Sequence, residues 1–547
     1  MKEEIGINLQ EYLHTPCGDI FISSYTEDSY TNVFLIVPGL GWHLAGPNRS
    51  NIQLAEYCNL HEIATVLFDY PGSGESAGLY SEQTIESLSF AFLAVYEYTM
   101  SRYNGNIFLL GFGIGNILIA LNKERLKHHK IVYYLPEFDF YKCLPKPWDD
   151  FVIDGIIDYG EDQSPQERYL FYKAVFGALH DVTYNPVSYT IVNDLEKMRH
   201  FHFKKCIDTE DALIISDSEE NGAYIKAEYW YINEFNTNKF PGDWYTTINL
   251  WPRVLEKLHM DITKWLHKQI CCKNQDESDE KCKINVSSIS INERIRRELI
   301  PFSSSGEDLY GVLHDNGVSS KKTCVVFVPG VGGSKVDSYI CGPRFGDFLA
   351  NRGMYFYRHD CRNEGTHISS LAGLNWTDII NDTLEALKQL SSKTECEQFY
   401  FVAWSAGIKT ICALSQIIPQ KIKGCCLWNP IFSDKPQKRE TPEFVMPKYI
   451  KNTHGVLVTQ YGGDFLGLNY VVDGRKYDFV DMYKNMESIV KIIWGSPDSG
   501  GEDYTIINSI NKHEHSETIH TRHHLFSYSD MDDLFEKTYQ WIERKEV

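Results

Sequence analysis

An internal repeat constrains the fold of this chain more than any other feature of its sequence. Three motifs occur twice in the same order: an apolar run that ends in Pro-Gly, a loop that begins with Asp and contains glycine, and an apolar run that ends in a turn centred on Gly or Ser. The copies lie 291, 291 and 292 residues apart for the pairs Pro38 and Pro329, Asp69 and Asp360, and Gly113 and Ser405. A register that holds across three motifs predicts a duplicated domain.

Apolar periodicity predicts the same series of strands and helices in each half. In the first half, 1–271, we expect a hairpin in 11–26, strands at 32–37, 64–69, 107–110, 130–135 and 212–216, helices at 50–61, 81–103, 113–126 and 253–270, and an inserted cap at 139–206. The second half, 288–547, repeats the plan with a shorter cap at 433–485 and a last helix at 532–542. Such alternation predicts an α/β fold with a mostly parallel, helix-flanked sheet in each half.

A charged stretch poor in apolar residues separates the two halves. It covers 272–287 and includes the run KNQDESDEKCKIN. A segment of this composition cannot bury an apolar face, so we predict a linker there.

A strand, a turn and a helix with serine at the apex are predicted at 399–413, FYFVAWSAGIKTICA. The apolar run ends before Ser405, and residues at helical spacing, Ile408, Ile411 and Cys412, follow directly. This is the context that a nucleophile elbow requires, although Ala403 replaces the first glycine of the usual Gly-x-Ser-x-Gly pattern. The alternative is an ordinary turn in which the serine only caps the helix.

Each half resembles an α/β-hydrolase domain, and the resemblance covers almost the whole chain. It rests on PGVGG at 329–333, HDCR at 359–362, AWSAG at 403–407 and a late Asp and His in the family order. These motifs are specific for the superfamily and not for a substrate class, and the second half is most similar to the esterase, lipase and thioesterase-like branches with a small lid. The resemblance implies two tandem α/β-hydrolase domains with cap insertions and a Ser-His-Asp triad in the second half.

The acid of the triad is expected just past a late strand, because in this family it follows the elbow. The apolar run at 490–494 is predicted to be that strand, and Asp498 after it is our predicted acid. Asp503 is the near rival, and Asp434, after the preceding strand, is the distant one. The alternative role for each carboxylate is a helix cap or a solvated turn.

The base is expected in the last loop, where TIHTRHHLF at 518–526 contains three histidines. The family often has His-x-Phe at this place, and His524 with Phe526 fits that pattern. His523 is the rival, whereas His520 lies inside the presumed strand. The residues between Asp498 and His524 leave room for one helix and one strand.

Two backbone N–H groups are predicted to meet the oxyanion. One belongs to Ala406, which follows the nucleophile at the start of its helix. The other belongs to Val331 in the glycine-rich loop, where Gly332 lets the chain turn closely. The alternative for this loop is a plain turn.

The first half lacks two of the three triad members. Gly113 stands at the apex of its elbow, and Asn249 aligns with His524. Glycine has no hydroxyl group, and an amide is not a base at neutral pH. We therefore predict a pseudoenzyme half that still folds, because its glycines remain, and that supports, docks or recognises.

Composition argues against several other classes of function. The formal net charge of −21 disfavours nucleic acids and anionic membrane surfaces as partners, since both need basic patches. No apolar run approaches the roughly 18 residues of a membrane span, and the first residues lack the apolar core of a signal peptide. We therefore expect a cytoplasmic protein whose 14 cysteines are reduced and mostly buried. No cofactor or metal is expected, because Cys271, Cys272 and Cys282 lack the partners of a zinc site.

Three functions agree with these residues. The first is a serine hydrolase that cleaves a small-molecule ester or thioester, which could be bound to a carrier protein. The second is an acyltransferase that uses the same triad to move an acyl group from a carrier-protein or coenzyme A thioester to an amine or alcohol. The third is a binding or scaffold protein with two inactive halves, for which Ala403 is the strongest support. The acyl group and the oligomeric state leave no mark in the sequence.

Overall fold

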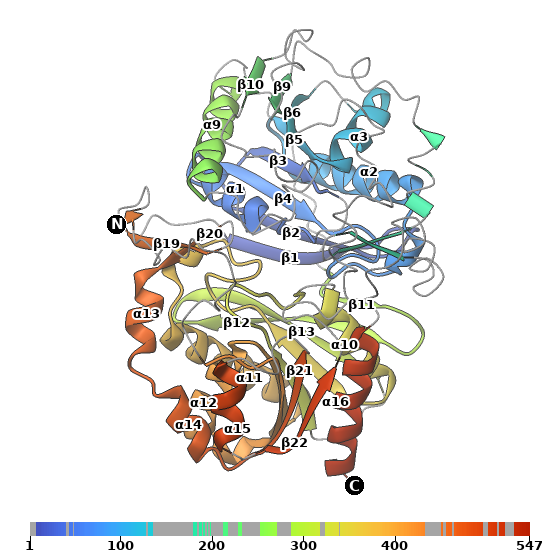
Figure 1. Ribbon diagram of the computed structural model, residues 1–547. Helices are drawn as coiled ribbons and strands as arrows, with labels where there is room; N and C mark the ends of the chain where they lie inside the picture. Colours follow the sequence, from blue (N-terminus) through green and yellow to red (C-terminus); the bar gives the residue numbers. More distant parts are fainter. Residues whose placement is uncertain are drawn as a thin grey trace, which may run out of the picture. The chain divides into compact units, whose positions relative to one another are not determined.

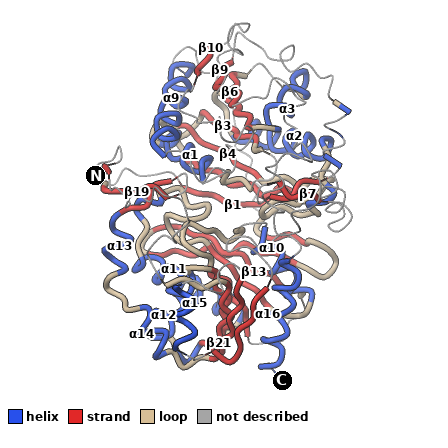
Figure 2. Tube along the Cα trace, viewed as in Figure 1, coloured by secondary structure: helices blue, strands red, loops and turns tan. Residues whose placement is uncertain are grey.

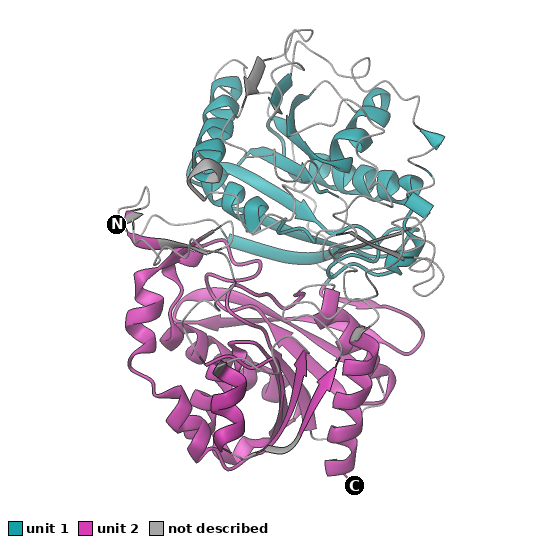
Figure 3. Ribbon diagram, in the orientation of Figure 1, with its two compact units in different colours: residues 1–286 teal, residues 287–547 magenta. Residues whose placement is uncertain are grey.

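The structure is a computed structural model that describes most of both halves of the chain. The described residues are 7–39, 43–46, 49–126, 129–134, 179–182, 185–188, 190, 191, 194, 197, 198, 212–216, 228–231, 252–270, 286–317, 323–337, 340–432, 450, 451, 456–461, 464–495, 502–510, 513–519 and 530–546. The chain divides into two compact units, 1–286 and 287–547 (Figure 3). The predicted linker at 272–287 lies almost wholly outside the described residues.

The first unit contains a mixed sheet in which the strands follow the order β1-β2-β4-β3-β5-β6-β9-β10 (Figure 1). Its strands are β1 (Ile7–Leu13), β2 (Ile20–Thr26), β3 (Asn32–Val37), β4 (Ile63–Phe68), β5 (Ile107–Phe112), β6 (Lys130–Tyr134), β9 (Ala212–Ser216) and β10 (Glu228–Tyr231). The first two strands form an antiparallel hairpin, β2 is antiparallel to β4, and every later pairing is parallel. A separate hairpin joins β7 (Leu179–Val182) to β8 (Asn185–Ser188).

Helices cover both faces of this sheet. The helices α1 (Ser50–Asn59) and α9 (Pro252–Ile270) lie on one face, and α2 (Ile85–Arg102) and α3 (Ile114–Leu121) lie on the other (Figure 1). Because both faces are covered, the strands between them are mostly apolar, and every residue of β4 and β5 is buried.

The second unit has the same plan with one additional edge strand, and its order is β11-β12-β13-β15-β14-β16-β17-β21-β22. Its strands are β11 (Ser288–Ser290), β12 (Arg296–Ser304), β13 (Glu307–Asp315), β14 (Thr323–Val328), β15 (Tyr355–His359), β16 (Gln398–Trp404), β17 (Ile422–Trp428), β21 (Ile489–Gly495) and β22 (His513–Ile519). The strands from β15 to β22 are parallel, whereas β11, β12 and β13 pair in antiparallel fashion. Figure 2 shows the strands of this unit in red, with helices in blue beside them.

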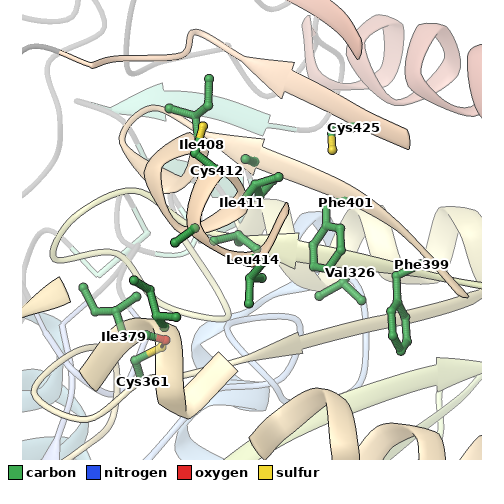
Figure 4. Packing of buried hydrophobic residues seen from close by; sticks show 14 of the residues in the cluster. Val326, Cys361, Ile379, Phe399, Phe401, Ile408, Ile411, Cys412, Leu414 and Cys425 are labelled. Atoms are coloured by element: carbon green, nitrogen blue, oxygen red, sulfur yellow. Dashed lines mark hydrogen bonds between the residues drawn. The ribbon is translucent and has the colours of Figure 1, made fainter. Parts of the chain in front are cut away.

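Two pairs of helices flank the second sheet. The helices α10 (Cys341–Asn351) and α16 (Asp530–Glu546) lie on one face, and α11 (Trp376–Thr394) and α12 (Gly407–Ile417) lie on the other (Figure 1). On the α12 face, Ile411 and Leu414 pack beside Phe401 of β16 and Val326 of β14 (Figure 4). The main apolar cluster of this unit contains only residues of this unit, and the same is true of the first unit.

The cap predicted at 433–485 is partly described. It contains a small antiparallel sheet of β18 (Ile450–Lys451), β19 (Leu457–Tyr461) and β20 (Asp464–Gly467), followed by α13 (Leu468–Gly474) and α14 (Phe479–Asn485). Between β21 and β22 lies α15 (Glu502–Ile510). Most of the cap predicted at 139–206 falls outside the described residues.

The predicted fold class, α/β with a mostly parallel and helix-flanked sheet in each half, is confirmed. The predicted start of the helix at 81–103 is wrong, because a short 3-10 turn (Tyr80–Glu82) precedes α2. Thr84 has an extended backbone, and its hydroxyl accepts the N–H of Ser87, so this residue caps the helix and fixes its first turn. The last helix, α16, is longer at both ends than predicted.

Candidate active site

Ser405 lies at the turn between β16 and α12, at the carboxyl edge of the parallel strands. Its φ is 52°, in the left-handed region that residues with a side chain rarely adopt. Ala406 has returned to helical geometry, with φ −68° and ψ −10°, and α12 starts at Gly407. A strained residue that is followed at once by a helix is the geometry of a nucleophile elbow.

Two backbone hydrogen bonds hold the strained residue in place. The N–H of Ser405 donates to the carbonyl of Trp428 at 2.8 Å, and the N–H of Ile431 donates to the carbonyl of Ser405 at 3.2 Å. Trp428 ends the neighbouring strand β17 and is fully buried. The apex is therefore fixed against the next strand of the sheet, as a preorganised site requires.

Small residues around the apex are required by the packing. A Cβ atom on Gly407 would lie 2.6 Å from the carbonyl oxygens of Val328 and Pro329, closer than real contacts allow. A Cβ atom on Gly330 would lie 3.2 Å from the Cβ of Ser405. Ala403, which replaces the expected first glycine, is buried and fits without disturbing β16. The departure from Gly-x-Ser-x-Gly is therefore compatible with the turn.

A small pocket lies beside the elbow, between the loop after β14 and the start of α12. The predicted oxyanion donors Val331 and Ala406 both line it, together with Gly330. The rest of the lining is formed by Val328, Pro329, His359, Cys361, Glu364, Trp376, Ile379, Thr383, Gly407 and Thr410. The structure thus brings both predicted donor residues to one pocket, which reaches the elbow through Ala406 and Gly407 and not through Ser405 itself.

Glu364 was not anticipated from the sequence. Its carboxylate accepts the N–H of Gly332 at 2.8 Å, although it lies 32 residues further along the chain. The side chain is buried and also lines the pocket. The only signal in the sequence was its place in the loop after HDCR, within the second repeated motif.

A buried ion pair holds the loop after β14 in place. Lys335 Nζ lies 2.6 Å from Asp360, whose carboxylate also accepts the backbone N–H groups of Lys335 and Thr366. Burial alone would raise the pKa of Asp360, but the charge of Lys335 and these hydrogen bonds outweigh it and lower the pKa to about 2. Asp360 therefore stays ionised at neutral pH and ties the loop after β14 to the loop after β15.

His359 is a second buried group in the pocket wall. Burial lowers its pKa to about 4, so the ring is neutral at pH 7. Its Nε2 lies 3.2 Å from the hydroxyl of Thr383, which itself donates to the carbonyl of Ile379. Because that hydroxyl proton is already donated, Nε2 is the protonated nitrogen of the ring.

The predicted acid and base lie outside the described residues. This holds for Asp498 and His524, and also for the rivals His523, His520 and Asp434. One helix, α15, and one strand, β22, do lie between positions 498 and 524, as the spacing predicted. The rival Asp503 is described: it is buried in α15 and accepts the N–H of Phe432 at 2.8 Å.

The elbow of the first unit has the same φ at its apex but no side chain there. Gly113 has φ 52°, the value found for Ser405. A Cβ atom on Gly115 would lie 2.2 Å from the carbonyl oxygen of Val37, as one on Gly407 would meet Val328. Asn249 lies outside the described residues.

The acidic loops of the two units also match. Asp69 accepts the N–H groups of Leu44 and Glu75, which stand 291 residues before the two residues that donate to Asp360. A lysine is missing there, because leucine occupies its place. This agreement supports the predicted duplication, which stays a prediction.

Of the nine described cysteines, only Cys17 is exposed, and none of the nine forms a disulfide. Within the described part of the chain, no group of three or more metal-ligating side chains is found. The described helices also include none with the length and apolar character to cross a bilayer.

No family model and no curated protein matches this chain. Among solved structures, it is similar to Est1E from Butyrivibrio proteoclasticus with bound ferulic acid, at 12% identity over 45% of this chain and 98% of that one, with a TM-score of 0.36. It is also similar to the acylaminoacyl peptidase of Pyrococcus horikoshii, at 15% identity over 46% and 42% of the two chains, with a TM-score of 0.34. The α/β hydrolase GrgF from Penicillium sp. sh18 matches at 11% identity over 46% and 98%, with a TM-score of 0.35.

These TM-scores are below 0.5, and the fold follows from the strand order and the turns of the two units. In each unit the sheet begins with antiparallel strands and continues with parallel ones. Two consecutive strands stand in reversed order in the sheet, β4 before β3 in the first unit and β15 before β14 in the second. A tight turn whose apex has φ 52° then joins β5 to α3 in the first unit and β16 to α12 in the second. The protein has the α/β-hydrolase fold.

Proposed function

We propose that the second half is a serine hydrolase that cleaves an ester or thioester. The observation that carries this proposal is Ser405, held in a left-handed conformation at the start of α12 beside a pocket lined by Val331 and Ala406. Backbone strain of this kind is concentrated at active sites, and a serine at the start of a helix is well placed for its hydroxyl to attack a substrate.

In the proposed mechanism, Ser405 Oγ attacks the carbonyl carbon of the substrate while His524 takes the hydroxyl proton. Asp498 orients the imidazole and stabilises its positive charge. The backbone N–H groups of Val331 and Ala406 meet the negative oxygen that forms. His524 then gives the proton to the leaving alcohol or thiol, and water hydrolyses the acyl-serine by the same route.

The test is a fluorophosphonate probe applied to the full-length protein, with the labelled peptide identified by mass spectrometry. We expect one label, on Ser405, and none in Ser405→Ala. Turnover of a p-nitrophenyl ester should fall by about 10⁴-fold or more in this variant, because triad members act as a unit. Ser415→Ala is the matched control, since Ser415 lies in the same helix and its hydroxyl donates to the carbonyl of Cys412.

An unlabelled parent, or turnover in Ser405→Ala within tenfold of the parent, would contradict the proposal. A label in the first half would contradict its assignment as a pseudoenzyme. That assignment is supported by Gly113, which offers no hydroxyl at the apex.

Acyl transfer is the second candidate, and the inactive apex at Gly113 is the observation that favours it. The first unit, which has no nucleophile at its apex, would then recognise the carrier protein that bears the thioester. Product analysis with an added amine or alcohol distinguishes the two: a transferase forms the amide or ester, whereas a hydrolase releases the free acid.

A further inference from the structure

We infer that Glu364 is a positioning residue, whose carboxylate holds the loop at 329–333 so that the N–H of Val331 faces the oxyanion. This inference rests on the proposed function and adds to it a residue outside the triad and the oxyanion hole. Its basis is one hydrogen bond between two loops, and what that bond does to the backbone between them.

The bond acts on the peptide unit next to the oxyanion donor. The N–H of Gly332 belongs to the planar peptide that joins it to Val331, and it donates to Glu364 Oε1 at 2.8 Å. Fixing that plane restricts ψ of Val331. A second bond, from the N–H of Gly333 to the carbonyl of Gly330 at 3.0 Å, closes the turn on its other side. The residue that carries the proposed donor is thus held from both directions.

Glu364 is itself held rigidly. Its N–H donates to the carbonyl of Cys361 at 3.2 Å, and its carbonyl accepts the N–H of His367 at 3.0 Å. Its side chain is only 5% exposed, so the carboxylate acts in a place that water hardly reaches. A hydrogen bond inside the protein, where the dielectric is low, is electrostatically stronger than the same bond in water.

The inactive half has no carboxylate at this place. Ser73 stands 291 residues before Glu364, in the corresponding loop after β4. Its hydroxyl accepts the side chain N–H of Gln83 at 2.9 Å, a bond inside its own segment of the chain. The carboxylate therefore accompanies the nucleophile: the half with serine at the apex has it, and the half with glycine does not.

The experiment measures kcat and KM for a p-nitrophenyl ester in full-length Glu364→Ala, Glu364→Gln and Glu364→Asp. Removing one oxyanion donor typically lowers kcat by about 10²–10³-fold, so a loosened donor in Glu364→Ala should lower it by roughly 10- to 100-fold. We expect KM to change by less than about threefold, because the loop acts on the transition state and not on substrate binding.

Glu364→Gln is the rescuing variant, since its amide oxygen can still accept the N–H of Gly332, and we expect kcat within about threefold of the parent. Glu364→Asp keeps the carboxyl group but is one methylene too short, so its kcat should fall further than that of Glu364→Gln. The Gln and Asp pair decides the matter even if Glu364→Ala fails to fold. Glu298→Ala is the matched control, because this buried carboxylate on β12 pairs with Arg296 and Lys393.

A kcat in Glu364→Ala equal to that of the control overturns the inference, and so does an Asp variant more active than the Gln variant. These outcomes leave the proposed function standing if Ser405 is labelled in the parent. A parent without a label on Ser405 overturns both, so the two failures are distinguishable.

Discussion

Gly365 follows Glu364, and it has a positive φ of 54°. A Cβ atom there would lie 2.1 Å from the carboxylate of Asp360, the residue that pairs with Lys335. The corresponding Gly74 of the first unit would meet Asp69 at the same distance. Glycine at this position is therefore needed twice, for its backbone conformation and for the space that the carboxylate occupies.

Gly365→Ala is predicted to destabilise the protein strongly. The matched control is Gly306→Ala, because Gly306 also has a positive φ but nothing within 4 Å of its added Cβ. The control should lose roughly 1–2 kcal/mol from backbone strain alone. Gly365→Ala should lose more than about 2 kcal/mol beyond that, since overpacking and a displaced ion pair are added. Urea denaturation of the two variants measures the difference, and equal losses would disprove the explanation.

At the scale of elements, the cap helix α13 is tied to the start of α11. Asp473 in the last turn of α13 accepts the N–H of Thr377 at 2.7 Å and also accepts its hydroxyl proton. Trp376, the first residue of α11, lines the pocket and packs on Tyr470 of the same cap helix. One junction thus connects a wall of the pocket to the cap.

Asp473→Ala is predicted to loosen this junction. Loss of a charged acceptor at this partly buried helix start should cost about 1.5–3 kcal/mol of unfolding free energy. Amide hydrogen exchange in 468–474 should accelerate more than exchange in α16. Lys476→Ala is the control, because Lys476 pairs with the same carboxylate from an exposed position and its loss should change little. Equal exchange rates in parent and Asp473→Ala would rule out the junction.

The elements were predictable from the sequence to a large extent, and the contacts between loops were not. Strands such as β14 and β16 follow from local apolar runs, and the turn at Ser405 follows from the switch between two periodicities. The bond between Gly332 and Glu364 joins loops after β14 and β15, which are neighbours only in the folded sheet. Local periodicity carries no information about such pairs. The positions of Asp498 and His524 stay predictions, because both lie outside the described residues.

At the scale of the whole molecule, burial holds three described histidines neutral. Burial lowers the pKa of His259 in the first unit to about 3, and that of His359 in the second to about 4. Burial, together with the charge of Arg358, also lowers the pKa of His314 to about 4, against the opposing effect of Asp347. Each ring takes up a proton more readily when the chain unfolds, so acid favours the unfolded state.

The unfolding free energy is therefore predicted to fall as the pH drops from about 6.5 towards 4. Because the folded pKa lies below the unfolded one, the stabilisation is complete above pH 6.5, and each histidine removes on the order of 1.4 kcal/mol per pH unit below it. His359→Gln should reduce the slope of unfolding free energy against pH by the contribution of one proton, about 1.4 kcal/mol per pH unit. The amide N–H of the glutamine can still reach Thr383. The measurement is urea denaturation of parent and variant between pH 7 and pH 4.5. Parallel curves for the two proteins would show that His359 does not contribute.

The left-handed apex makes an exchange of serine for glycine favourable to the backbone and the reverse exchange unfavourable. Gly113 and Ser405 share φ 52°, a conformation that glycine adopts freely and serine adopts only under strain. Any copy of this domain that exchanges serine for glycine loses its hydroxyl and relieves its backbone in the same step. The reverse exchange destabilises the fold before a base and an acid stand ready to use the new hydroxyl. On grounds of stability alone, glycine is therefore favoured over serine at this single position, and a serine there calls for a use of its hydroxyl group.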